Sequence, residues 1–159
     1  MTGISKPKIK SGEKSAIKYA TNAERAWEEE GEVALSSIEK TQHDIGAKYA
    51  RIKISTRKIE GKDARAGGAV YDDLLQELCV DHSIIEDTDK RFIVQTRECP
   101  FLSVWERAGE DAPKLCESFG KSFVQGLCES VNPKLRYSVT RMMSKGEPYC
   151  EERIELLHT

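Results

Sequence analysis

The fold of this chain follows from the stretch RFIVQTRECPFLSVW, residues 91–105. Its first half is rich in β-branched residues and places Phe92, Val94 and Thr96 on one face of an extended strand. That strand ends at Cys99-Pro100, because proline lacks the N–H group that would continue a hydrogen-bonded ladder. The stretch therefore predicts a thiol at the end of a β-strand.

Two hairpins are predicted around this point. The four strands cover residues 83–87, 90–98, 135–143 and 149–157. A helix over residues 112–130 connects the hairpins, and Asp111 is placed to cap its first turn. Hairpins pair antiparallel, so the second half of the chain predicts a four-stranded antiparallel sheet.

Helices are predicted before the sheet, over residues 15–30, 33–59 and 70–79. The second of them is the clearest, because its apolar residues recur along one strip of the cylinder: Leu35, Ile38, Ile45, Tyr49, Ile52 and Ile59. The glycine-containing residues 61–68 predict a break. The fold class is α+β, a sheet covered by helices with a long N-terminal amphipathic helix.

The apolar strip of the long helix leaves two outcomes open. It can pack on the sheet, which is the simpler outcome, or it can pair with a second copy of the chain in a homodimer.

The bulk composition narrows the class of protein. The length of 159 residues suits one domain, here residues 15–159, after a lysine-rich mobile tail over residues 1–14.

A net charge of -2 argues against nucleic acid as the main partner. No run of about 18 apolar residues predicts a membrane span. The N-terminal residues lack the apolar core of a signal peptide, so five cysteines indicate a reducing, cytoplasmic location.

Three distant cysteines, Cys99, Cys116 and Cys150, are predicted to meet at one edge of the sheet. Alternation along the last strand puts Cys150 and Glu152 on the same face as Ile154, which suits the core. Burying a carboxylate on that face costs free energy unless the group is paired or takes part in the function. Two alternatives remain: Glu152 reaches water at the sheet end, or a bulge shifts the register.

A family resemblance rests on the order and spacing of short motifs. These are the hairpin from Ile85-Glu86-Asp87 to Val94, then Cys99-Pro100-Phe101, Leu115-Cys116, Asn132-Pro133, and Gly146 followed by Cys150. In them the chain resembles the L-2-amino-thiazoline-4-carboxylic acid hydrolase-like family. The resemblance implies a small soluble protein that opens a thiazoline carboxylate ring to give an N-carbamoyl cysteine. The layout is also similar to the vinyl-4-reductase domain, a small-molecule-sensing module with a cysteine- and carboxylate-rich zinc site in some members.

Hydrolysis of such a ring needs a nucleophile at an amidine-like carbon. Cys99, Cys116 or Cys150 can attack as a thiolate, or a metal-bound water can. Acid–base candidates are Glu117, Glu152 and His82, which sits where helix meets sheet.

The substrate carboxylate has its own candidates, because arginine binds carboxylates through two parallel hydrogen bonds. These candidates are Arg97 and Arg141.

The alternative function is a binding module without catalysis. Cys99, Cys116, Glu117 and Cys150 form a candidate four-ligand zinc set beside an apolar ligand pocket. A third interpretation is that the cysteines only fill the core, where free cysteine is common.

Overall fold

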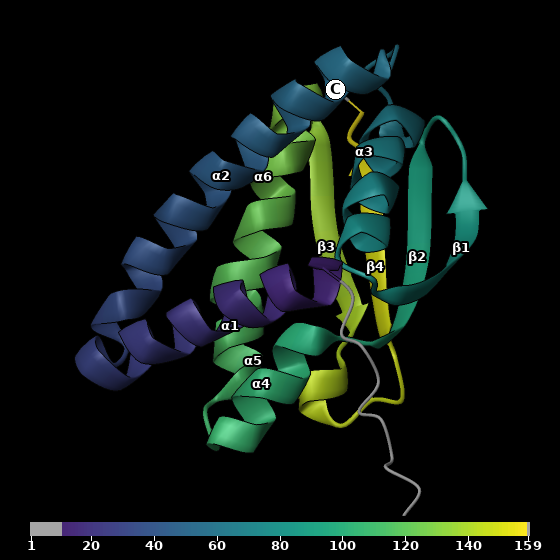
Figure 1. Ribbon diagram of the computed structural model, residues 1–159. Coiled ribbons are helices and arrows are strands. Elements are labelled where there is room, and N and C mark those ends of the chain that lie inside the picture. Colours follow the sequence, from purple (N-terminus) through teal and green to yellow (C-terminus); the bar gives the residue numbers. More distant parts are fainter. Residues whose placement is uncertain (1–10, 159) are drawn as a thin grey trace, which may run out of the picture.

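The computed structural model describes residues 11–158 and has the predicted α+β fold. Figure 1 shows a four-stranded sheet with helices in front of it. The strands are β1 (Asp81–Asp87), β2 (Arg91–Glu98), β3 (Leu135–Arg141) and β4 (Cys150–Leu156). Their order is β1-β2-β4-β3, and every pairing is antiparallel. The two hairpins therefore meet where β2 pairs with β4.

The helices lie before the sheet and between its hairpins. They are α1 (Ser11–Glu30), α2 (Val33–Arg57), α3 (Ala64–Glu77), α4 (Pro100–Ala108), α5 (Ala112–Leu115) and α6 (Ser122–Val131). A π-helical segment, η1 (Cys116–Lys121), joins α5 to α6, and a short turn of 3₁₀ helix, η2 (Met143–Lys145), lies before β4. Together α5, η1 and α6 match the helix predicted over residues 112–130. Single π-helical turns inside α-helices are rare and frequent at functional sites.

The long helix α2 is present, but its predicted strip is buried only in part: Ile38 is buried, and Leu35 and Tyr49 are half-buried against the hydrophobic clusters. The residues that α2 buries are Ala34, Ile38, Gly46 and Ala50. Ile45 and Ile52 are instead 44% and 50% exposed. The reason is contact with α6: a Cβ atom at Gly46 would overlap the carbonyl oxygen of Phe123, and one at Gly126 would overlap that of His43. Two glycines thus bring the backbones together, and the amphipathic character of α2 is not confirmed.

The predicted break over residues 61–68 is mostly helix. Asp63 caps α3 by accepting a hydrogen bond from the Ala66 N–H at 2.9 Å, so the helix starts at Ala64 rather than near residue 70. A Cβ atom at Gly68 would overlap the ring of Phe92. The glycines therefore allow α3 to approach the sheet closely.

Two hydrophobic clusters stabilise the molecule. One lies between α3, α6 and the inward face of the sheet, where Phe92, Leu127 and Ile154 are almost fully buried. The other joins α1, α4 and η1 around Trp105, whose indole N–H donates to the Ala20 carbonyl at 3.0 Å. Burial of such aromatic and aliphatic side chains contributes about 1.5–3 kcal/mol each.

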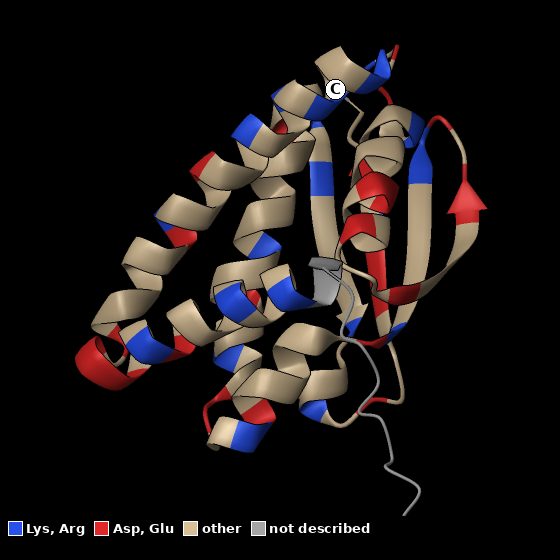
Figure 2. Cartoon of the chain, in the orientation of Figure 1, with Lys and Arg blue, Asp and Glu red and all other residues tan. Residues whose placement is uncertain are grey.

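The remaining expectations concern the chain end and the surface. Helix α1 begins at Ser11, so residues 11–14 of the predicted tail are helical, whereas residues 1–10 lie outside the described residues. Within the described part of the chain, no helix combines the length and apolar character that a bilayer crossing needs. Figure 2 shows basic and acidic residues mixed along α1 and α2.

Candidate functional site

A cavity of about 380 Å³ lies between the helices and one end of the sheet. Its wall is mostly apolar and aromatic. Helices contribute Tyr49, Leu75, Phe101 and Val124, and the π-helical segment contributes Phe119. The cavity thus touches both hydrophobic clusters.

All three predicted cysteines line this cavity. Cys99 follows β2 and occupies the N-cap position of α4, Cys116 begins η1, and Cys150 begins β4. The antiparallel register sets Cys150 opposite Thr96 at the end of β2, so both hairpins end at the cavity. Each of the three is a partly buried, free cysteine. The structure therefore brings these residues to one place, while their chemical roles stay predictions.

Glu152 also lines the cavity, with only 8% of the residue exposed. It lies in a strand with neighbours on both sides, opposite Val94 of β2 and Val139 of β3. The irregularity in the β3–β4 pairing comes after Val139 and leaves Glu152 in register. Alternation from the buried Ile154 turns Glu152 inward, and neither the wet sheet end nor the bulge applies.

Two tyrosine hydroxyls donate hydrogen bonds to the same carboxyl oxygen, Oε1 of Glu152. One comes from Tyr71 on α3 and the other, at 2.5 Å, from Tyr137 on β3. Their rings meet edge to face with centroids 6.0 Å apart. The other oxygen, Oε2, is buried and has no hydrogen-bond partner among the described residues. The hydrogen-bonding capacity of this oxygen is therefore not used by the described residues.

Burial raises the pKa of Glu152, and the hydrogen bonds from Tyr137 and Tyr71, with the nearby Thr96 side chain, offset this only in part. Burial, followed by the nearby Glu152 charge, raises the pKa of both tyrosines well above their ordinary value. Both hydroxyls therefore keep their protons and remain donors at neutral pH.

Burial also raises the pKa values of the cavity thiols. It raises the pKa of Cys99 to about 11 and that of Cys116 to about 12, and it raises the pKa of Cys150 as well. The thiolate, not the thiol, is the nucleophile and the metal ligand. The cavity therefore holds neutral thiols at pH 7.

His82 does not line the cavity. Its Nδ1 lies 2.8 Å from the Val80 carbonyl oxygen, and its Nε2 lies 2.7 Å from a carboxylate oxygen of Asp72. Burial alone would lower the pKa of His82, but these hydrogen bonds outweigh it and raise the pKa. Its charge also lowers the pKa of Glu152, against the larger effect of burial.

Neither arginine predicted to hold a substrate carboxylate lines the cavity. Arg97 is exposed and donates to the Ser83 hydroxyl at 3.0 Å, because alternation along β2 turns it away from Thr96. Arg141 ends β3, where it pairs with Glu147 at 3.6 Å and lies over the ring of Tyr149. Both guanidinium groups are thus engaged at the surface.

Glu117 lies outside the cavity wall. It accepts a hydrogen bond from Lys145 at 3.2 Å on the surface. It sits one residue after Cys116, which turns it round the helix from the thiol. The predicted zinc set of three cysteines and Glu117 is therefore not assembled in this structure.

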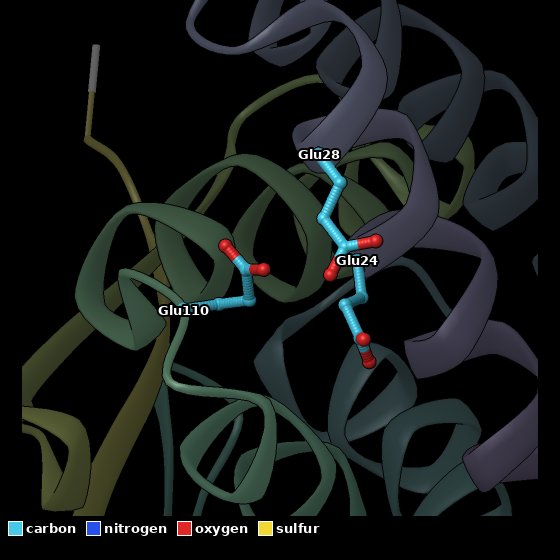
Figure 3. Close-up of side chains that lie close together, drawn as sticks. All are labelled: Glu24, Glu28 and Glu110. Carbon is cyan, nitrogen blue, oxygen red and sulfur yellow. The ribbon is translucent and has the colours of Figure 1, made fainter.

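One other group of side chains does bring ligand atoms together. In the described range, only the carboxylates of Glu24, Glu28 and Glu110 have three ligand atoms within 4.8 Å of one another. Figure 3 shows them converging from α1 and the segment after α4. They share no wall with the cavity and are the kind of acidic surface group that is common without a metal.

The two tyrosines at Glu152 were not predicted as site residues. Periodicity marks Tyr71 as part of an apolar helix face and Tyr137 as part of a strand face, which predicts burial only. A buried tyrosine needs a partner for its hydroxyl. Two buried hydroxyls that need a partner and one inward carboxylate are the only features of the sequence that suggest contact between these three residues.

No family model matches the chain, and no curated protein matches it. Solved structures do match. Subunit 3 of a trafficking protein particle complex from Naegleria fowleri, covalently bound to palmitic acid, has a TM-score of 0.63 at 12% identity. The match covers 92% of this chain and 95% of that one.

A second solved structure is the phenol-responsive sensory domain of the transcription activator PoxR with phenol. It has a TM-score of 0.56 at 11% identity, over 89% of this chain and 74% of that one. At such identities the likeness shows a shared fold.

Proposed function

We propose that this chain is a binding module for an apolar small molecule that carries a polar group. The observation that carries the proposal is the cavity of about 380 Å³ lined by Glu152, whose Oε2 is buried without a hydrogen-bond partner among the described residues. Ligand sites in proteins are concave and mostly apolar, roughly 300–1,000 Å³ in volume, with a few placed polar groups. The cavity has this character.

Core packing alone does not account for such a space. Protein interiors have few voids larger than a water molecule, and an engineered void of about 150 Å³ already binds benzene. A buried polar atom without a partner costs about 1–3 kcal/mol. A molecule that fills the cavity and bonds to Oε2 of Glu152 removes both penalties.

The two solved structures with the same fold support this proposal. One holds palmitic acid and the other phenol, and each molecule has an apolar body with one polar end. The cavity wall of this chain, with aromatic residues around a single buried carboxyl, suits a molecule of that general kind.

Ring-opening hydrolysis of a thiazoline carboxylate is the second candidate. Its supporting observation is that Cys99, Cys116, Cys150 and Glu152 line one cavity. The raised thiol pKa values and the surface positions of both arginines weaken it. Turnover of 2-amino-thiazoline-4-carboxylate by the purified protein, lost in Cys99→Ser or Cys150→Ser, would establish hydrolysis. Elemental analysis of the same samples tests for zinc.

Binding is tested by filling the cavity. Gly120 lines the cavity, and a Cβ atom there meets no atom within 4 Å. Gly120→Leu therefore adds an apolar side chain at the cavity wall, where its Cβ atom has room. We expect the wild type to bind the neutral fluorophore N-phenyl-1-naphthylamine at one site per chain, and Gly120→Leu to bind it at least tenfold more weakly.

The matched control is Ser37→Leu, which adds the same side chain at an exposed position of α2. Its binding should equal that of the wild type, and circular dichroism should show all three proteins folded. Equal binding by wild type and Gly120→Leu, or no binding by the wild type, contradicts the proposal.

A further inference from the structure

We infer that the polar group of the ligand is a single uncharged hydroxyl, held by Oε2 of Glu152 inside the cavity. This inference rests on the proposed function and specifies the chemical class of its ligand: an apolar alcohol or phenol rather than an acid, an amine or an ether.

The geometry of the carboxyl is the first step. Oε1 of Glu152 accepts from both Tyr71 and Tyr137, so its lone pairs are occupied. A neutral Glu152 therefore carries its proton on Oε2 and offers a donor to the cavity. An ionised Glu152 offers an acceptor at the same atom.

A hydroxyl fits both states of the carboxyl. It accepts from a neutral Glu152 and donates to an ionised one, because a hydroxyl has one donor and two acceptor lone pairs. An ether accepts only, so it serves the neutral state alone. An ammonium group donates only, so it serves the ionised state alone.

A carboxylate ligand meets the opposite problem. Next to Glu152 it can only be held by the neutral form, and the remaining charges of the lining do not compensate it there. Glu77 is acidic and already accepts from Tyr49 at 3.0 Å, while Lys121 is exposed. A carboxylate bound through Lys121 would leave Oε2 of Glu152 without a partner.

The test compares four linear ligands of eight carbons each. Isothermal calorimetry at pH 8 measures wild-type affinity for 1-octanol, octanoate, octylamine and 1-methoxyheptane, the last an isomer of octanol without the O–H. We expect octanol to bind at least about tenfold more tightly than octanoate and octylamine, the effect of one hydrogen bond or one uncompensated charge.

Variants at position 152 separate the hydroxyl contact from hydrophobicity. In Glu152→Leu the preference for octanol over 1-methoxyheptane should fall by about tenfold relative to the wild type. In Glu152→Gln the discrimination against octanoate should shrink, since the uncharged amide donates a hydrogen bond to a carboxylate at every pH. Glu155→Gln is the control, because it makes the same change on the opposite face of β4.

The outcomes distinguish this inference from the proposed function. If the wild type binds all four ligands with similar affinity, or prefers octanoate, the hydroxyl inference is overturned while an apolar binding site stands. If no ligand of the series binds to folded wild type, both fail. A wild-type preference that persists unchanged in Glu152→Leu also overturns the role given to Glu152.

Discussion

At the scale of single residues, the inward carboxylate of Glu152 is the most informative feature. Alternation along the last strand predicts its direction before any coordinates, since Cys150, Glu152 and Ile154 share a face. The two hydroxyl partners could not be predicted, because Tyr71 and Tyr137 come from elements 81 and 15 residues away in the chain. Sequence periodicity reports which face a residue occupies, whereas the partner across that face depends on tertiary packing.

A pH dependence of stability follows from this carboxyl. The pKa of Glu152 is raised above its ordinary value of 4.5, so folding favours the protonated form. The stabilisation of the folded state by protonated Glu152 is complete below pH 4.5. It is lost as the pH rises through the raised pKa. Urea unfolding from pH 4.5 to 8 should therefore show wild-type stability falling relative to Glu152→Gln.

Other titratable groups near Glu152 do not produce this pH-dependent difference in stability between the wild type and Glu152→Gln. His82 also has a raised pKa and loses stabilisation as the pH rises, but it is present in both proteins. The tyrosines and cysteines facing the carboxyl titrate well above pH 8. Parallel stability curves for the two proteins would show that Glu152 is not held in the neutral form.

The cavity thiols should react slowly. With a pKa near 11 rather than the ordinary 9, Cys99 carries about 100-fold less thiolate at pH 8. Peptide mass spectrometry after iodoacetamide treatment should find Cys99 and Cys116 modified far more slowly than a cysteine in a denatured control. A fast-reacting thiol among them would contradict this account and favour the nucleophile of the hydrolase candidate.

At the scale of elements, strands were easier to predict than helix faces. Alternation and the Cys99-Pro100 stop predict β2 to within one residue of its start. The apolar strip of α2 predicts its buried face only in part, since Ile45 and Ile52 are exposed and the close contact with α6 lies at Gly46 and Gly126. Glycines do not contribute to a hydrophobic pattern. The pattern therefore does not show that they allow two helices to approach closely.

The contact between α2 and α6 gives a direct test at this scale. Gly46→Ala places a methyl group against the Phe123 carbonyl, so we expect destabilisation of about 1–3 kcal/mol or more. Gly120→Ala is the control, because its Cβ meets no neighbour within 4 Å and alanine favours helix by about 1 kcal/mol. Equal stability of the two variants in urea unfolding would mean that the helices are not in backbone contact.

At the scale of the whole molecule, the sheet delivers three distant segments to one cavity. The chain order of helices and hairpins predicts the α+β class, and the pairing of β2 with β4 brings Cys99 and Cys150 to the same end. The cavity itself could not be predicted, because its volume is the space that six helical segments and three strands leave unfilled. That space, more than any single motif, supports a binding function.

The most direct test of this function is calorimetric titration of 1-octanol into the wild type and into Gly120→Leu under identical conditions. The cavity predicts saturable binding at one site per chain in the wild type, and at least tenfold weaker binding in the filled variant. Identical titration curves for the two folded proteins would contradict the claim that the cavity is a binding site.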